Sequence, residues 1–361
     1  MEYFATYCSN TLAGSGNQFF FYNENQQPTR SCTLYQVTNG GEYPYSFLFS
    51  NTIDSTFSDG AVSHKNLVVD AWTIEEMLVG VCSRCDAESF EYPQNRKQVL
   101  FGGHQKKVVN PAELFCTDAV TLNAKKGEYI CVEIVFSGNM IPYHEESIIP
   151  SFIDQNGEWL ASKKHPFVSM VGIQKPTKKK IAFLGDSITQ GIGTPVNSYE
   201  HWNAVLANLL GDEYAYWNLG LGYGRADDAA SDGIWLYKAK QNDIVFVCYG
   251  VNDILQGYSA DGIKKNLQTI VDQLHDFGIC VIVQTIPPFS YSEEQCGKWR
   301  EVNDFIQYEL KHAALVFDCV KYLAKSESES HIAKYGGHPN SDGCNVWGKA
   351  LFEAVVDVIQ A

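Results

Sequence analysis

A serine follows an apolar segment at Gly185 to Thr189, which reads Gly-Asp-Ser-Ile-Thr. The four residues before this stretch are apolar, and glycines follow at positions 191 and 193. A short apolar run bounded by glycine is typical of a buried strand in a parallel sheet, and ligands bind outside the carboxyl ends of such strands. We therefore expect Ser187 at the edge of a sheet, where its hydroxyl can act as a nucleophile. The simpler interpretation is a turn in which Ser187 or Thr189 only caps the next helix.

Two later segments supply the other groups that acyl transfer needs. The apolar segment 243–249 runs into Gly-Val-Asn-Asp, which presents the amide of Asn252, and Gly-Gly-His-Pro-Asn places His338 just before a helix. A hydroxyl, an amide and an imidazole can act as nucleophile, oxyanion donor and general base. The alternative for His338 is a histidine at a helix entry with no chemical role.

These three segments, in this order and at this spacing, resemble the motifs of the SGNH hydrolases, which are also called GDSL esterases. The resemblance covers about residues 178–361. It implies that Ser187 attacks an ester carbonyl and that His338 takes the serine proton and returns it to the leaving alcohol. The backbone N–H of Ser187 and the amide of Asn252 would stabilise the oxyanion, and Asp186 would shape the turn. Neither a metal nor another cofactor is required.

The sequence departs from the family at the second oxyanion donor. A glycine N–H normally completes the oxyanion hole, but an ungapped match of Asn218 to Arg225 puts Tyr223 in that column, with Gly222 beside it. Any residue except proline has a backbone N–H, so either Gly222 or Tyr223 is expected to donate. Arg225 would either meet a polar substrate or pair with a neighbouring carboxylate, and we favour the pairing.

A second departure concerns the group that orients the histidine. The family usually has an aspartate three residues before the histidine, and Tyr335 occupies that position here. In a triad this carboxylate holds the imidazole tautomer, a contribution of up to about 10⁴ in rate. We consider a Ser-His dyad first, with His338 donating to a backbone carbonyl. A substitute carboxylate ranks second, and a weakened site on a binding protein ranks third. The candidate carboxylates are Glu327, Glu329 and Asp342.

The composition excludes several classes of function. The chain has 361 residues, 45% of them hydrophobic and 19% charged, which is ordinary for a globular protein and suggests two domains. Its net charge of −15 disfavours nucleic acid and acidic polymers as partners, because their phosphates or carboxylates need a basic surface. We expect no signal peptide and no membrane span, and therefore a cytoplasmic location.

The 11 cysteines are an odd number in a large chain, which fits free thiols better than a disulfide framework. Cys82 and Cys85 form the one close pair. They would be half of a zinc site or a redox pair, but without a second pair at matching spacing the simpler interpretation is two reduced cysteines.

Residues 1–175 are predicted to form a β-sandwich, or jelly roll. Tyr45–Ser50 and Tyr129–Phe136 alternate in the manner of strands, and Ile130, Val132, Ile134 and Phe136 would share one face. Turn signals separate the strands, at positions 39–41, 58–60, 102–103 and 126–127. The basic, proline-containing segment 175–180 marks the domain boundary.

Residues 176–361 alternate strand and helix, which predicts a three-layer α/β/α domain with a parallel sheet. We expect strands at 181–185, 214–218, 243–249, 279–283 and 315–317. Helices are expected at 199–210, 226–240, 263–277 and 293–312, and a last helix carries an apolar stripe through Val346, Trp347, Ala350, Leu351, Ala354, Val355 and Val358. Five such strands fit the flavodoxin-like layout of the SGNH hydrolases.

The resemblance also indicates the substrate. Several SGNH esterases that act on carbohydrate carry an N-terminal β-sandwich, and the layout here looks like theirs. We therefore expect an O-acetylesterase that acts on imported oligosaccharides derived from plant polysaccharides. The alternatives are a lipid or thioester acylhydrolase with a deep apolar acyl pocket, and a non-catalytic carbohydrate-binding protein on the same scaffold.

Overall fold

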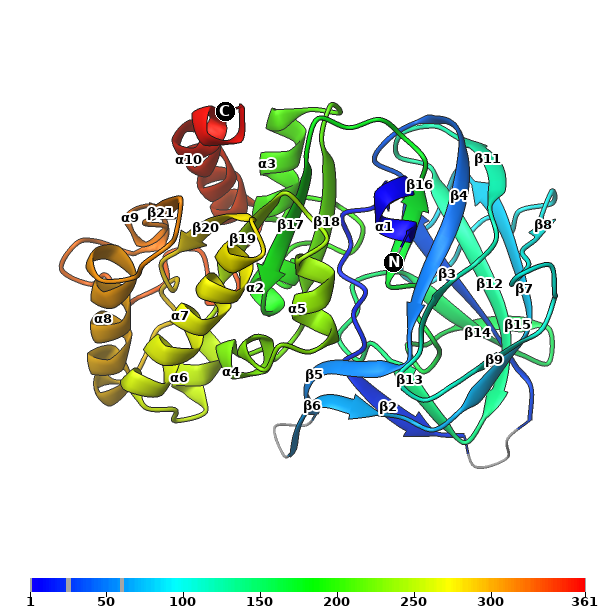
Figure 1. The fold of residues 1–361 in the computed structure, drawn as a ribbon, viewed down its shortest axis with the longest axis horizontal. Coiled ribbons are helices and arrows are strands. Elements are labelled where there is room, and N and C mark those ends of the chain that lie inside the picture. The colour runs from blue at the N-terminus through cyan, green and yellow to red at the C-terminus, as the bar shows by residue number, and fades with distance from the viewer. Residues whose placement is uncertain (1, 24–26, 59–61, 361) are drawn as a thin grey trace. The chain divides into compact units, whose positions relative to one another are not determined.

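A computed structural model describes residues 2–23, 27–58 and 62–360 of the chain (Figure 1). The turn expected at 58–60 lies mostly outside the described residues. The chain divides into two compact units, Met1–Pro176 and Thr177–Ala361. The first consists mainly of strands, and the second alternates strands with helices.

The N-terminal unit contains two main antiparallel sheets. One has the order β1 (Cys8–Ser9), β16 (Met170–Ile173), β4 (Gly41–Ser50), β10 (Leu114–Cys116), and β11 (Val120–Ala124) also pairs with β4. The other has the order β15 (Glu158–Ala161), β14 (Ser151–Gln155), β3 (Thr29–Gln36), β12 (Tyr129–Gly138), β7 (Trp72–Cys82), β8 (Lys97–Gln98), and β9 (Lys107–Val109) pairs with β7. The smaller elements are α1 (Tyr3–Thr6), the pair β2 (Phe19–Tyr22) and β13 (Met140–Tyr143), and the pair β5 (Thr52–Ser58) and β6 (Val62–Val68).

Strand β12 is buried on both faces. Its alternating residues Ile130, Val132, Ile134 and Phe136 are buried, as the sequence predicts, but two residues between them, Cys131 and Glu133, are buried as well. The reason is a second apolar cluster on the other face of the sheet, to which Cys131 and Tyr129 of β12 belong. Phe90 and Trp159 pack against this cluster. The pattern of one strand therefore does not show that both of its faces are covered.

The C-terminal unit is built on a five-stranded parallel sheet. Its order is β18 (Ala215–Gly220), β17 (Lys180–Gly185), β19 (Ile244–Cys248), β20 (Cys280–Gln284), β21 (Leu315–Phe317). In chain order this is 2-1-3-4-5, the doubly wound flavodoxin-like arrangement, whose ligand site lies where the strand order reverses. The reversal places that site next to β17, which leads into Ser187.

Helices connect the strands of this unit. They are α2 (Ser187–Gln190), α3 (Trp202–Leu210), α4 (Ala226–Ala230), α5 (Ile234–Ala239), α6 (Val251–Leu255), α7 (Ala260–Asp276), α8 (Glu293–Tyr308), α9 (Val320–Leu323) and α10 (Ser341–Gln360). The last helix buries Trp347, Leu351 and Val355 of its predicted stripe, whereas Ala354 is exposed. Trp347 stacks on Trp202 of α3 at 5.0 Å between ring centroids.

The single helix expected at 226–240 is wrong, because two helices occupy this stretch. Helix α4 ends at Ala230, Asp232 adopts a left-handed conformation with φ of 53°, and Gly233 caps the start of α5. Aspartate tolerates the left-handed region better than most residues, and glycine favours helix ends. The short segment Ser231-Asp232-Gly233 therefore turns the chain between the two helices.

No helix in the described part of the chain is long and apolar enough to cross a membrane.

Candidate active site

Three loops that carry predicted site residues leave the same edge of the parallel sheet. Gly185 at the end of β17 pairs with Gly220 of β18 on one side and with Cys248 of β19 on the other. Ser187 follows β17, Tyr223 follows β18 and Asn252 follows β19. Since neighbouring parallel strands end at the same edge, the topology brings these segments of the sequence to one place.

In the turn after β17, Asp186 rather than Ser187 caps the next helix. Asp186 is the N-cap residue of α2, and its carboxylate accepts a hydrogen bond from the backbone N–H of Ile188 at 2.9 Å. A side chain that caps a helix satisfies one of the N–H groups that the first turn leaves unpaired. Asp186 has this role, so the alternative in which Ser187 or Thr189 caps the helix is wrong.

Ser187 and His338 are in direct contact. The distance between Ser187 Oγ and His338 Nε2 is 2.8 Å, although the two residues lie 151 positions apart in the chain. Gly193 in the turn after α2 makes the approach possible, because a Cβ there would lie 2.8 Å from the carbonyl oxygens of His338 and Pro339. This is the hydrogen bond through which a histidine removes the proton of a serine nucleophile.

The imidazole of His338 is held by packing. Phe289 contacts it edge to face, with 5.4 Å between ring centroids and an interplanar angle of 79°. Gly337 leaves room for this ring, since a Cβ there would lie 2.9 Å from Phe289. Burial lowers the pKa of His338 below its usual value of 6.5. The imidazole is therefore neutral near pH 7, as a general base must be.

No carboxylate among the described residues makes a hydrogen bond to His338. Among these residues, the one side-chain hydrogen-bond partner of the imidazole is the hydroxyl of Ser187. Tyr335 packs its side chain against Gly343 and lies under the ammonium of Lys334. Glu329 pairs with Lys325 at 2.9 Å. Of the three explanations for the missing aspartate, this arrangement fits a Ser-His dyad, but the expected hydrogen bond from His338 to a backbone carbonyl is not found among the described residues.

The backbone N–H of Gly222 is occupied. It donates to Gln190 Oε1 at 2.7 Å, so Gly222 is not the oxyanion donor in this arrangement. The neighbouring Tyr223 has a φ of 59°, in the left-handed region that disfavours a bulky side chain. Strained backbone of this kind is characteristic of functional sites. Tyr223 is therefore the better candidate of the two.

Asn252 is tied to the same loop. Its Nδ2 donates to the carbonyl oxygen of Gly224 at 2.9 Å, next to Tyr223 in the chain. An amide nitrogen carries two hydrogens, so this bond fixes the side chain and leaves a second hydrogen for a ligand. Gln190 and Asn252 together hold the loop on which the second oxyanion donor is expected.

Arg225 pairs with a carboxylate, as the favoured alternative has it. The side chain is buried, and its guanidinium donates to both carboxylate oxygens of Asp228, with Nε 2.8 Å from Oδ2. It also donates to Gln256 and Tyr258. A buried guanidinium that is already paired in this way has a structural role.

Two buried carboxyl groups lie behind the catalytic loops. Burial, together with the charge of Asp253, raises the pKa of Asp186 to about 7. Burial, together with the charge of Asp228, likewise raises the pKa of Asp253 to about 7. Asp253 accepts a hydrogen bond from the backbone N–H of Ala226 at 3.0 Å. Asp253 thus connects the loop after β19 to the start of α4.

Three residues of the site carry no sequence signal that would assign them a role. Gln190 lies in the serine motif, but its contact with Gly222 depends on how two loops meet. Phe289 follows two prolines after β20, and Asp253 looks like an ordinary acidic residue in the first turn of a helix. No group of histidine, cysteine and acidic side chains suited to a metal ion occurs within the described ranges.

Comparison with known proteins identifies the domain around this site. Residues 183–346 match the model of the GDSL-like lipase/acylhydrolase family. No curated protein matches the chain.

Several solved structures resemble about half of the chain. One is a member of the lipolytic protein G-D-S-L family from Veillonella parvula, 22% identical with a TM-score of 0.42, covering 49% of this chain and 98% of that one. Another is an acetyl xylan esterase, 23% identical with a TM-score of 0.40, covering 49% and 99%. A third is a carbohydrate esterase of family 3 from Talaromyces cellulolyticus, 21% identical with a TM-score of 0.37, covering 50% and 98%.

Proposed function

We propose, from the premise that residues 183–346 form a domain of the GDSL-like lipase/acylhydrolase family, that this carboxylic ester hydrolase removes O-acetyl groups from carbohydrate. The observation that carries the proposal is the contact of 2.8 Å between Ser187 Oγ and the Nε2 of His338. A hydroxyl beside a neutral imidazole is the minimal apparatus for forming an acyl-enzyme.

The reaction proceeds in two halves. In the first, His338 takes the proton of Ser187 while Oγ attacks the ester carbonyl, and the imidazolium then protonates the departing sugar hydroxyl. In the second, His338 deprotonates a water molecule that attacks the acetyl-serine, and the imidazolium then returns the proton to Ser187 Oγ as acetate leaves. Each half passes through a tetrahedral oxyanion, and the donors we assign to it are the backbone N–H groups of Ser187 and Tyr223 and the amide of Asn252.

The lack of a carboxylate hydrogen-bonded to His338 within the described ranges is compatible with this reaction. The pKa of the imidazole is lowered by burial, so it is in the proton-accepting form without help. Phe289 restricts the orientation of the ring by contact rather than by charge. The imidazole of His338 therefore acts as the base of a Ser-His dyad.

Carbohydrate as the substrate is supported by the organisation of the chain. In the chain, the motifs follow a strand-rich unit, Met1–Pro176. The SGNH carbohydrate esterases with an N-terminal β-sandwich, which the sequence resembles, have the same order. We propose that this unit is a jelly-roll-like sandwich. A lipid or thioester hydrolase would not need this unit.

The test is acetate release from acetylated xylooligosaccharides, with p-nitrophenyl acetate and p-nitrophenyl octanoate assayed alongside. We expect release of acetate from the oligosaccharide, hydrolysis of p-nitrophenyl acetate, and slow hydrolysis of the octanoate. Faster hydrolysis of the octanoate, without acetate release from the oligosaccharide, would replace the proposal with a lipid or thioester hydrolase. Ser187→Ala, with Ser328→Ala as the control, identifies the site responsible.

A further inference from the structure

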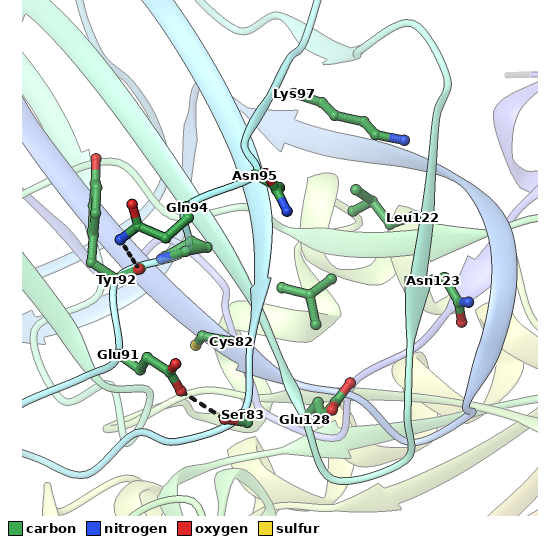
Figure 2. Close-up of a pocket in the computed structure, with 12 residues that line it drawn as sticks. Cys82, Ser83, Glu91, Tyr92, Gln94, Asn95, Lys97, Leu122, Asn123 and Glu128 are labelled. Atoms are coloured by element: carbon green, nitrogen blue, oxygen red, sulfur yellow. Dashed lines mark hydrogen bonds between the residues drawn. The ribbon is translucent and has the colours of Figure 1, made fainter.

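The N-terminal unit contains a cavity of its own, with a volume of about 670 Å³ (Figure 2). Two of its walls are the segment 91–97 and the turn that joins β11 to β12, and the end of β7 contributes to it. Its apolar lining includes Val81, Pro93 and Leu122, whereas amides and carboxylates supply much of the rest. The polar members are Ser83, Glu91, Gln94, Asn95, Lys97, Asn123 and Glu128.

A buried charge cluster fixes the segment that forms one wall. Glu133 of β12 has only 2% of its side chain exposed, and it accepts hydrogen bonds from Arg30 at 2.6 Å and Arg96 at 2.9 Å. The hydroxyl of Tyr92 also donates to Glu133. Tyr92 and Arg96 lie on either side of Gln94 and Asn95 in the chain, so the cluster holds both ends of the short stretch that carries these amides.

Packing reinforces the same stretch. Pro93 lies so close to Gly80 of β7 that a Cβ at that position would be 2.8 Å from the proline ring. Phe90 packs against the apolar cluster of the sheet and contacts Phe152 at 4.8 Å between ring centroids. A binding site whose walls are fixed before the ligand arrives avoids the cost of ordering them.

The opposite wall is the tight turn through which the chain passes from β11 in one sheet to β12 in the other. Glu128 accepts a hydrogen bond from the backbone N–H of Lys125 at 2.7 Å, which closes the turn between β11 and β12. Leu122 of β11 is 4% exposed at the floor of the cavity, and Asn123 beside it is exposed. Across the cavity, Glu91 accepts from Ser83 at 2.7 Å (Figure 2). These carboxylates are held in place and retain lone pairs for further donors.

We propose that this cavity is a binding site for a neutral saccharide, distinct from the esterase site. A sugar ring presents hydroxyls that both donate and accept, together with apolar C–H faces. Asn95 and Asn123 offer donors and acceptors, Glu91 and Glu128 offer acceptors, and Leu122 offers an apolar floor. Pockets for drug-like ligands are lined mostly by apolar side chains with a few placed polar groups. The lining of this cavity is more polar than the lining of such pockets.

Other ligand classes fit the cavity less well. An anionic ligand would meet two carboxylates against one ammonium, and Lys97 already donates to the carbonyl oxygen of Thr121 at 2.7 Å. An acyl chain would leave the amides and carboxylates of the rim without partners, which is costly. The arrangement of donors and acceptors therefore favours an uncharged polyhydroxyl ligand.

The experiment is affinity electrophoresis of the full chain in native gels that contain a neutral polysaccharide. The probes are arabinoxylan, glucomannan, mixed-linkage β-glucan and hydroxyethyl cellulose, with polygalacturonate as the anionic comparison. The test variant is Asn95→Ala combined with Asn123→Ala, and Gln155→Ala on β14 is the matched control with another exposed amide removed. Far-UV circular dichroism and the melting temperature verify that each variant folds.

We expect at least one neutral polysaccharide to retard the wild type, and the double variant to bind it about tenfold or more weakly, because two hydrogen-bonding groups are lost. Ser187→Ala and Gln155→Ala would bind like the wild type, and the double variant would hydrolyse p-nitrophenyl acetate at the normal rate. Retardation by none of the neutral probes, by polygalacturonate alone, or equally in the double variant would overturn the proposal. Since binding and ester hydrolysis are measured separately, failure of one leaves the other standing.

Discussion

Two polar clusters of this chain differ in charge: one is built around a paired carboxylate, and the other is an uncharged pair. In the N-terminal unit, the buried carboxylate of Glu133 is surrounded by Arg30, Arg96 and the hydroxyl of Tyr92. In the C-terminal unit, the half-buried imidazole of His338 faces a neutral serine hydroxyl and an aromatic ring, with no carboxylate bonded to it among the described residues.

The difference separates a structural cluster from a chemical one. A buried charge whose hydrogen bonds are all satisfied holds neighbouring segments in place, and removing it costs stability. An uncharged pair whose proton can move contributes little to stability and is suited to reaction. We therefore expect changes at Glu133 to lower stability while activity is retained, and changes at Ser187 to abolish activity while stability is retained.

The largest effect is expected from Ser187→Ala. Without the nucleophile no acyl-enzyme forms, and kcat for p-nitrophenyl acetate should fall by about 10⁴-fold or more. The melting temperature should stay close to that of the wild type, because the lost hydroxyl makes one hydrogen bond. Ser328→Ala, which removes an exposed hydroxyl from the same unit, should change neither quantity. If Ser187→Ala lowered the melting temperature but kept its activity, Ser187 would have the structural role assigned here to Glu133.

The next largest effect is expected from Asn252→Ala. Loss of one oxyanion donor typically lowers kcat by about 10²- to 10³-fold. The side chain also holds the carbonyl of Gly224, so part of the loss would come from movement of the loop that carries Tyr223. Steady-state kinetics should show the fall in kcat with a much smaller change in KM. An unchanged kcat would remove Asn252 from the oxyanion hole.

Glu133→Gln should change stability instead. The substitution keeps the shape of the side chain but removes the charge that Arg30 and Arg96 share, for a loss on the order of 2–3 kcal/mol. In a unit of this size that corresponds to a melting temperature lower by about 5–10 °C. Calorimetry measures the shift. The rate of p-nitrophenyl acetate hydrolysis at 25 °C should stay within about twofold of the wild-type value, and a larger loss would contradict the separation of roles.

The pH dependence of kcat/KM reports on His338. Burial places the pKa of the imidazole below 6.5, and the base must be unprotonated to accept the serine proton. Activity should therefore fall as the pH is lowered through a value below 6.5, and stay on its plateau at neutral pH. The measurement is kcat/KM for p-nitrophenyl acetate from about pH 4 to 9. A midpoint above 6.5 would indicate a carboxylate partner that the structure does not contain.

The smallest effects are expected at the carboxylates that were candidates to orient the histidine. Asp342→Asn, Glu327→Gln and Glu329→Gln should each leave kcat within about twofold, whereas loss of a true triad carboxylate lowers it by about 10⁴-fold. Parallel kinetics of the three variants decide the matter. A large loss in any one of them would replace the dyad with a triad.

The sequence predicted most where chemistry and local pattern coincide. Ser187, Asn252 and His338 each stand beside a strand or a helix entry, so the resemblance could be recognised from three short segments, and the family model confirms it. The parallel α/β architecture was also predictable, because strands and helices alternate strictly.

Contacts between distant segments were not predictable. The bond from Gly222 to Gln190 and the packing of Phe289 on His338 depend on how loops meet at the sheet edge. The helix break at Asp232 had a local signal in Ser231-Asp232-Gly233, which the strong helical pattern on both sides concealed. In the N-terminal unit, burial of both faces of β12 follows from the loop that carries Phe90, which the alternation of one strand cannot reveal.

The central claim is that Ser187 is the nucleophile and that His338 activates it. The most direct measurement is labelling with diethyl p-nitrophenyl phosphate, followed by intact mass and peptide mapping. We expect one diethylphosphoryl group on Ser187, activity lost in step with labelling, and very slow labelling of His338→Ala. A label on another residue, or full activity in the labelled protein, would contradict this claim.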